Sequence, residues 1–305
     1  MTKSTISTFQ LFEMFPDAET ARTYMESKRW PAGAVCPACS EAKRITTRKG
    51  GFYRCNACKS DFTVRTGTIF ERSHIPLHKW LYAMYLLVTA RKGISSLQLA
   101  AQIGVTQKSA WFMLQRLREA CGNDPTVLSG FVEIDEAFIG GKEANKHKGK
   151  KLNAGRGAVG KTAVLGMREK GGRTKAAVIH DTSANTLHRA IHGHVEPGST
   201  LHTDEHGGYR GLDGLFYRHE TVAHGQGEYV RDGVTTNSIE SVWAVMKRGL
   251  HGVYHSASAK HLDRYVSEFT FRLNDGDVKH HTLDRITSLL MAATGPRLTY
   301  KDLIA

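Results

Sequence analysis

Two pairs of cysteines constrain the fold of this chain more than any other feature. Cys36 and Cys39 form one Cys-x-x-Cys pair, and Cys55 and Cys58 form a second after fifteen intervening residues. Four thiolates about 2.3 Å from one Zn²⁺ ion make a closed tetrahedral site, and two such pairs supply that geometry. A redox Cys-x-x-Cys pair is the alternative, but it does not explain a second pair at this spacing. The sequence therefore predicts a structural Zn²⁺ ion in a zinc ribbon, with a hairpin turn at 49–51.

The charge balance indicates a polyanionic partner. The 305 residues include 42 lysines and arginines against 29 acids, a formal net charge of +13. This favours nucleic acid, ahead of a membrane surface. No stretch approaches 18 consecutive apolar residues, which excludes a membrane-spanning helix. The N-terminus lacks the apolar core of a signal peptide, so we expect a cytoplasmic, nucleoid-associated protein with no membrane partner.

The predicted ribbon carries basic side chains that suit contact with phosphate groups. Arg48 and Arg54 flank the turn of the expected hairpin, and only Glu41 and Asp61 oppose the positive charges around them. Lysine and arginine contacts with phosphates supply the part of DNA affinity that does not depend on base sequence. We therefore expect Arg48 and Arg54 to contact DNA; an ordinary solvated surface is the alternative.

The segment after the ribbon predicts three helices. Apolar residues recur every three or four positions from Leu77 to Val88, as in an amphipathic helix. Two further helices, at 95–103 and 106–121, are joined by a short turn containing Gly104, which is typical of a helix-turn-helix. A plain three-helix packing unit is the alternative. The side chains that the last helix is expected to present to DNA are Gln107, Lys108 and Gln115.

The remainder of the chain alternates strands and helices, which predicts an α/β domain. A basic, glycine-containing loop is expected at 142–161. The expected strands are 131–138, 162–167, 175–179, 200–203 and 220–223, and the expected helices are 184–192, 237–250 and 260–273.

Three acids in this domain are candidate metal ligands. Asp135 and Asp204 each end a short apolar strand, where side chains converge at the edge of a sheet, and Glu240 lies on a later helix. Two carboxylates about 4 Å apart repel by roughly 4 kcal/mol at an effective dielectric constant of about 20, so a cation must compensate. A ligand set made only of oxygens selects Mg²⁺ or Mn²⁺. Two such ions would clamp the attacking and leaving oxygens of a phosphoryl transfer.

Each acid also has a competing interpretation. Asp135 could cap a turn, and Glu240 stands three residues after Asn237, the spacing of a helix capping box. The rival ligands are Glu133 and Glu136 beside Asp135, and Glu205 beside Asp204.

The helix that carries Glu240 offers two further candidates. Lys247 lies seven residues after Glu240, so the two side chains are within about 20° of each other around the helix. We expect Lys247 to contact a DNA phosphate; an ordinary surface lysine is the alternative. Trp243 is expected to pack at the edge of the helix, and stacking on a flipped base is the other possibility.

The motifs together resemble those of bacterial insertion-sequence transposases of the group numbered fifteen-ninety-five, in which a zinc ribbon precedes a DDE catalytic domain. The resemblance extends from about residue 8 to residue 275. The matching stretches are Cys36-Pro-Ala-Cys39, Phe52-Tyr-Arg-Cys-Asn-Ala-Cys58, Phe62-Thr-Val-Arg-Thr-Gly-Thr68, Val132-Glu-Ile-Asp-Glu136, Gly140-Gly-Lys142, Thr203-Asp-Glu-His-Gly-Gly-Tyr209 and Thr236-Asn-Ser-Ile-Glu-Ser-Val-Trp-Ala-Val-Met-Lys-Arg-Gly249.

The resemblance implies a ribonuclease H-like catalytic domain with a mixed sheet. The three acids of the family fall on Asp135, Asp204 and Glu240, and the family lysine falls on Lys247. The implied activity is metal-dependent cleavage at the ends of an element, followed by attack of the freed 3′-hydroxyl on target DNA. The implied partners are the double-stranded DNA of the terminal inverted repeats and of the target, and a second copy of the chain in a homodimer or larger assembly.

The expected organisation has four parts. Residues 1–62 comprise an N-terminal helix and the zinc ribbon, 63–125 the helix-turn-helix region, 128–275 the catalytic domain and 276–305 a C-terminal tail. Two other functions remain open. One is a structure-specific ribonuclease H-like nuclease that cuts without joining, and the other is a non-catalytic DNA-binding regulator.

Overall fold

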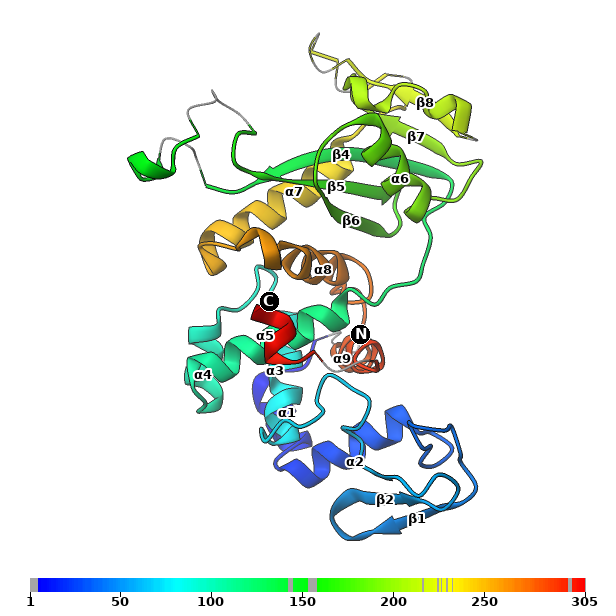
Figure 1. Cartoon of the computed structure of the whole chain (residues 1–305), viewed down its shortest axis with the longest axis vertical. Coiled ribbons are helices and arrows are strands. Elements are labelled where there is room, and N and C mark those ends of the chain that lie inside the picture. The colour runs from blue at the N-terminus through cyan, green and yellow to red at the C-terminus, as the bar shows by residue number, and fades with distance from the viewer. Residues whose placement is uncertain are drawn as a thin grey trace. The chain divides into compact units, whose positions relative to one another are not determined.

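The computed structural model divides into two compact units (Figure 1). One consists of Met1–Asp124 with Asp275–Ala305, and the other of Pro125–Asn274. The residues that the structure describes are 5–141, 145–152, 158–215, 217–223, 225, 227–228, 230–231, 233–295 and 298–304.

The first unit begins with two short helices and the ribbon. Helix α1 spans Thr8–Met14 and was not anticipated. Helix α2 spans Ala18–Arg29 and begins where Asp17 accepts a hydrogen bond from the backbone N–H of Thr20. The predicted hairpin is confirmed, because β1 (Ile45–Arg48) and β2 (Phe52–Cys55) pair antiparallel around the turn Lys49–Gly51, with β3 (Asp61–Phe62) beside β2. Aromatic contacts among Trp30, Tyr53 and Phe62 pack this small sheet against the end of α2.

The three helices predicted after the ribbon are present. They are α3 (Leu77–Thr89), α4 (Ser96–Ile103) and α5 (Gln107–Cys121). Gly104 ends α4 with a φ of 62°, a left-handed conformation that glycine adopts without strain and that turns the chain sharply toward α5. Gln115 is fully buried rather than facing outward. The reason is that α5 packs against α3, α4 and α9, so the middle of this helix faces protein on several sides.

Residues 276–305, which we set apart as a C-terminal tail, contain two helices. Helix α9 (Thr282–Ala292) packs against α2, α3 and α5, and α10 (Tyr300–Ile304) places Tyr300 against Phe112. The buried Ile286, Leu289 and Leu290 of α9 recur at three- and four-residue spacing, so this helix contributes to the core of the first unit.

The irregular segment between β3 and α3 is held by arginine side chains. Because this segment lacks regular hydrogen bonding, its carbonyl groups need other donors. These arginines are therefore structural, and their charge is already engaged inside the protein. The bonds run from Arg29 to Val64 O, from Arg65 to Ser73 O and Ile75 O, and from Arg116 to Ile69 O and Glu71 O, at 2.7–3.2 Å.

We expect Arg116→Ala to lower the free energy of unfolding by about 3 kcal/mol, because each hydrogen bond from a charged donor contributes roughly 1.5–3 kcal/mol. Urea unfolding followed by circular dichroism measures the change. The control is Arg91→Ala at an exposed position after α3, for which we expect a change within about 0.5 kcal/mol. Equal stability of the two variants would contradict the structural role of Arg116.

The second unit is built on a mixed five-stranded sheet in the order β6-β5-β4-β7-β8. Strands β4, β5 and β6 pair antiparallel, whereas β4, β7 and β8 run parallel. The predicted strands are confirmed, except that the last lies at 218–221 rather than 220–223. The bounds are β4 Phe131–Ile139, β5 Thr162–Glu169, β6 Thr174–Ile179, β7 Thr200–Thr203 and β8 Arg218–Thr221.

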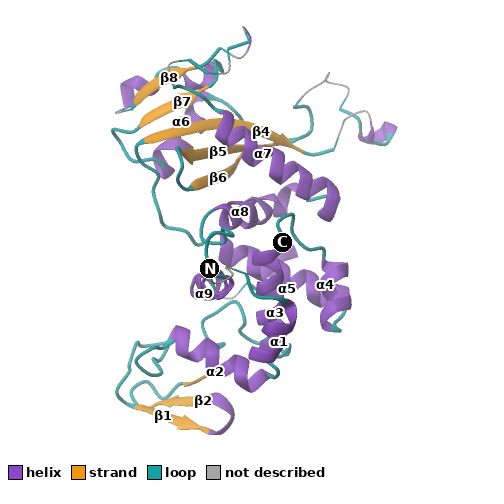
Figure 2. Cartoon of the chain, turned by 180° about the vertical axis from the view of Figure 1, so that it is seen from behind, coloured by secondary structure: helices purple, strands orange, loops and turns teal. Residues whose placement is uncertain are grey.

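Helices cover both faces of this sheet (Figures 1 and 2). Helix α6 (Ala184–His194) contributes Leu187 and Ile191 to the core on one face. Helices α7 (Asn237–Gly249) and α8 (Leu262–Leu273) form the core on the opposite face. Alternate residues of β4 therefore face different helices, and Asp135 lies on the α7 side.

The predicted loop 142–161 falls partly outside the described residues; its described part contains a short 3₁₀ helix at Lys148–Lys150 and a turn closed by the hydrogen bond from Lys161 N to Ala158 O. Within the described ranges, the helices are all too short or too polar to cross a membrane.

Candidate functional site

The pairing of β4 with β7 aligns two of the candidate acids. The strands are parallel, and Glu133 pairs with His202. Asp135 lies two residues further along β4, and Asp204 directly follows the end of β7 at Thr203. Because the strands are parallel, both acids lie toward the same end of the two strands.

Helix α7 carries the third acid across the same face of the sheet. It packs against both β4 and β5. Glu240, in its first turn, is half-buried and accepts a hydrogen bond from the Thr236 hydroxyl at 3.3 Å. The helix begins at Asn237 and has Thr236 as its N-cap, without a side-chain cap hydrogen bond. The capping box with Asn237 as N-cap is therefore absent.

Glu133 makes a different contact from that expected of a rival ligand. Its Oε2 atom accepts hydrogen bonds from Ser238 N at 2.8 Å, Ser238 Oγ at 2.6 Å and Ile239 N at 3.2 Å. A carboxylate at these positions satisfies the free N–H groups at the start of α7 and interacts favourably with the helix dipole. Glu133 thus fixes the N-terminus of α7 to β4.

Trp243 provides a second attachment of α7 to β4. Its indole Nε1 donates a hydrogen bond to Asp135 Oδ2 at 2.9 Å. The ring is only 4% exposed, so the structure does not favour stacking on a flipped base. The sequence alone did not reveal this contact, which joins residues 108 positions apart.

The other two rival ligands differ in their surroundings. Glu205 is hydrogen-bonded elsewhere, whereas Glu136 Oε1 is buried without a hydrogen-bond partner among the described residues. The Glu136 side chain is largely buried on the opposite face from Asp135, with His206 Nδ1 3.6 Å from its Oε1. Burial and the negative charges of Asp204 and Asp135 raise the pKa of Glu136 to about 7. Glu205 is exposed and accepts a hydrogen bond from the backbone N–H of Gly225.

The electrostatics of Asp135 reflect its neighbours. Burial raises the pKa of Asp135 to about 6. The hydrogen bond from Trp243 lowers this pKa, while the negative charges of Asp204 and Glu240 raise it. Asp204 and Glu240 therefore both act electrostatically on Asp135, and an added cation would relieve this repulsion.

The cysteines form a tighter set than the acids. The Sγ atoms of Cys36, Cys39, Cys55 and Cys58 all lie within 4.8 Å of one another. Two of the Sγ–Sγ distances are 3.6 Å, close to the edge of about 3.8 Å of a tetrahedron with Zn–S bonds of about 2.3 Å. In the part of the chain that the structure describes, no other group of three or more potential ligands is gathered so closely. The four cysteines thus fit a structural zinc ion.

Apart from the buried Gln115, the residues predicted to contact DNA are at least partly exposed, and they belong to both units. Arg48 and Arg54 share the outer face of the hairpin, and each approaches Asp61, at 3.3 and 3.2 Å. Gln107 donates to Ser96 Oγ at the start of α4, and the Lys108 Nζ atom lies 4.8 Å from the centre of the Tyr300 ring. In the other unit, Lys247 is exposed in the last turn of α7.

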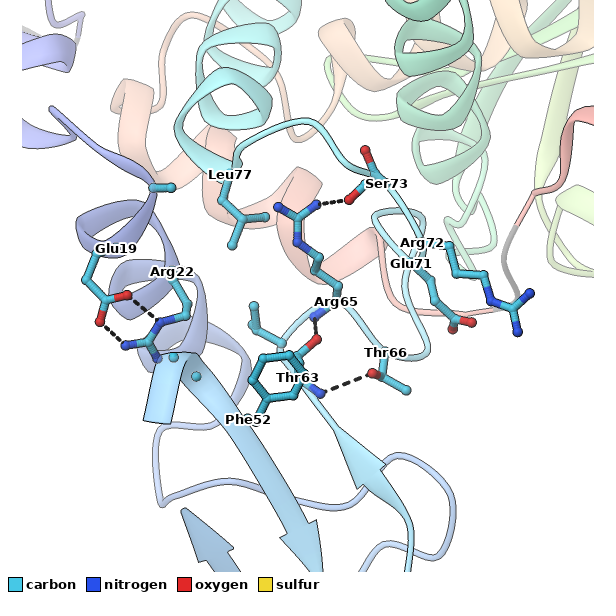
Figure 3. A pocket seen from close by; sticks show the side chains of 14 residues that line it. Glu19, Arg22, Phe52, Thr63, Arg65, Thr66, Glu71, Arg72, Ser73 and Leu77 are labelled. Carbon is cyan, nitrogen blue, oxygen red and sulfur yellow. Dashed lines mark hydrogen bonds and ion pairs between the residues drawn. The ribbon is translucent and has the colours of Figure 1, made fainter. Parts of the chain in front are cut away.

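A cavity of about 700 Å³ lies in the first unit between α2, the tip of the hairpin and the segment that leads into α3 (Figure 3). Three arginines line it, but two are already bonded within the protein. Arg22 pairs with Glu19, and Arg65 donates to the carbonyl of Ser73.

Comparison with known families agrees with this architecture. Residues 16–61 match the model of the transposase zinc-ribbon domain, and residues 127–274 match that of the ISXO2-like transposase domain. These domains define a transposase-type protein with an N-terminal zinc ribbon. Both matched regions of the chain are thus similar to domains of IS1595 transposases, as the motifs indicated.

Two individual proteins illustrate its relationships. The chain is 29% identical over 276 residues to a Halobacterium salinarum protein described as an uncharacterized protein in transposable element ISH50, an alignment that covers 85% of this chain and 91% of the relative. A chain from the simian T-cell lymphotropic virus intasome in complex with PP2A regulatory subunit B56 gamma aligns at 13% identity with a TM-score of 0.28, covering 64% of each chain. A likeness this weak carries no argument.

Proposed function

We propose that this protein is a DNA transposase that cuts the ends of an insertion sequence and joins them to target DNA. The observation that carries the proposal is the parallel pairing of β4, which contains Asp135, with β7, which directly precedes Asp204. Helix α7, which carries Glu240, packs against the same sheet. The electrostatic influence of Asp204 and Glu240 on Asp135 supports the same grouping. The strand order, with an antiparallel β4-β5-β6 meander extended by parallel β7 and β8, supports a ribonuclease H-like catalytic domain over 128–275.

Asp135, Asp204 and Glu240 are the residues that we propose to hold Mg²⁺ or Mn²⁺, with two ions expected. Their donors are all carboxylate oxygens, which suit these ions, and their mutual repulsion is what a divalent cation would offset. The ions would stabilise the attacking and leaving oxygens of phosphoryl transfer. The protein's own contribution is to fix three acids on rigid elements and to supply Lys247 for a DNA phosphate.

DNA recognition is proposed for the first unit. The ribbon in 1–62 would contact phosphates through Arg48 and Arg54. Helices α4 and α5 in 63–125 would act as a helix-turn-helix, in which Gln107 reads the inverted repeat and Lys108 contacts a phosphate. Because two ends of one element must be joined, we propose a homodimer or larger assembly on DNA. This substrate places the reaction in the cytoplasm, at the nucleoid.

Strand transfer into a plasmid tests the proposed activity. Purified full-length chain, a labelled duplex carrying the DNA that flanks its reading frame and a supercoiled target are incubated with Mg²⁺ or with EDTA. We expect joined product only with Mg²⁺. Cleavage without joining would instead indicate a structure-specific nuclease, and binding without either reaction would indicate a regulator.

We expect Lys108→Ala to weaken DNA binding to all sequences and to reduce the slope of log affinity against log salt by about 1, since one phosphate contact is lost. Fluorescence anisotropy between about 50 and 200 mM salt measures the slope. Lys170→Ala, at an exposed position in the turn after β5, is the matched control. An unchanged slope for Lys108→Ala would remove Lys108 from the DNA interface.

A further inference from the structure

We infer that Trp243 is a positioning residue for Asp135, and that Gly166 is the position that admits it. The inference rests on the proposed metal-binding role of Asp135. It adds Trp243 and Gly166, which are neither acidic nor basic, to the residues that shape the proposed metal site. Trp243 stands in the second turn of α7, and Gly166 pairs with Asp135 across β4 and β5.

The contact of Trp243 with Asp135 is specific in geometry. The indole N–H is the only polar group of a tryptophan side chain, and a buried one requires an acceptor. Here that acceptor is Asp135 Oδ2, at 2.9 Å, and the ring is nearly fully buried. The bond fixes one oxygen of the carboxylate and restricts rotation of its plane.

Gly166 explains how the indole ring reaches this position. A Cβ atom added at Gly166 would lie 2.4 Å and 2.6 Å from two carbon atoms of the Trp243 ring and 2.8 Å from Ile239 Cδ1. Gly166 lies inside a strand, where glycine is normally unfavourable. Close approach of the Trp243 ring therefore accounts for glycine at this position.

Together, the two attachments of α7 to β4 restrict the position of Glu240 relative to Asp135. Glu133 fixes the start of α7 to β4, and Trp243 fixes its second turn to Asp135. Glu240 lies between these two attachments, so its distance from Asp135 is set by them. Hydrogen bonds that orient metal-ligating groups typically change metal affinity by about 10–100-fold when they are removed.

The first test replaces Trp243 by β-(3-benzothienyl)alanine, which keeps the shape of the ring but lacks the N–H. Mn²⁺ binding to the full-length chain is measured by isothermal titration calorimetry, with Trp111→Phe in the other unit as control. We expect Mn²⁺ affinity to fall about 10–100-fold, with DNA binding in EDTA unchanged. Wild-type Mn²⁺ affinity in this variant would overturn the positioning role.

The second test is a double-mutant cycle on melting temperature. We expect Gly166→Ala to lower the melting temperature in the presence of Trp243 and to have a smaller effect beside Trp243→Phe. The shorter ring removes the two closest contacts of the added methyl group, and the contact with Ile239 Cδ1 at 2.8 Å remains. Equal effects in both backgrounds would overturn the role of Gly166. If the wild-type chain binds no Mn²⁺, the proposed metal-binding role of the acids is wrong, and Trp243 does not orient a metal ligand. The double-mutant cycle would still test whether Gly166 and Trp243 pack against each other.

Discussion

Replacement of Glu240 by Gln is expected to reduce metal-dependent DNA cleavage by at least about 10³-fold, since a metal ion supplies several kcal/mol of charge stabilisation in the transition state. Gln is nearly isosteric and still accepts the hydrogen bond from the Thr236 hydroxyl, so α7 should remain folded. Only the negative charge is lost. Gel analysis of a labelled duplex measures cleavage, with circular dichroism to confirm folding.

The matched control for this substitution is Glu205→Gln. Glu205 follows Asp204 directly but is exposed and bonded to the backbone of Gly225, a contact that Gln can retain. We expect this variant to cleave at the wild-type rate. If Glu205→Gln were the inactive variant and Glu240→Gln the active one, the third acid would be assigned to the wrong element.

Cys55→Ser is expected to remove the zinc ion and unfold the ribbon while the second unit stays folded. Cys55 is fully buried among the four cysteines, and zinc binding to such sites supplies about 10–16 kcal/mol of folding free energy. The remaining core of the ribbon is too small to replace it. Zinc content by mass spectrometry should fall from about one ion per chain to nearly none, and limited proteolysis should cut within 36–62.

The control for the zinc prediction is Cys121→Ala. Cys121 is buried at the end of α5 and lies outside the zinc-ligand set. This variant should retain its zinc. A wild-type chain purified without zinc under metal-replete conditions would contradict the zinc site itself.

Local patterns predicted much of this fold because they are set by neighbouring residues. The cysteine spacing predicted the ribbon, and the three- and four-residue apolar spacing predicted α3. The apolar runs predicted the strands of the mixed sheet. The register of β4 and β7 follows from pairing between distant segments. That the acids ending these two runs, Asp135 and Asp204, form one site stays a prediction.

Long-range contacts were the part that local patterns could not predict. The burial of Gln115 depends on packing of α5 against other helices, including one from the C-terminal segment. The contacts of Glu133 with α7 and of Trp243 with Asp135 link residues more than 100 positions apart. A mid-strand glycine at 166 was the one signal in the sequence that another group approaches the sheet closely there.

The most direct test of the carboxylate site is the number of Mn²⁺ ions bound by the chain on a short duplex, measured by electron paramagnetic resonance. We expect two ions for the wild-type protein beyond the background of the DNA. The Asp135→Asn/Asp204→Asn double variant should lose at least one of them while it keeps its zinc and its DNA affinity in the absence of Mn²⁺ and Mg²⁺. Identical Mn²⁺ binding by the two proteins would contradict a metal site at these acids.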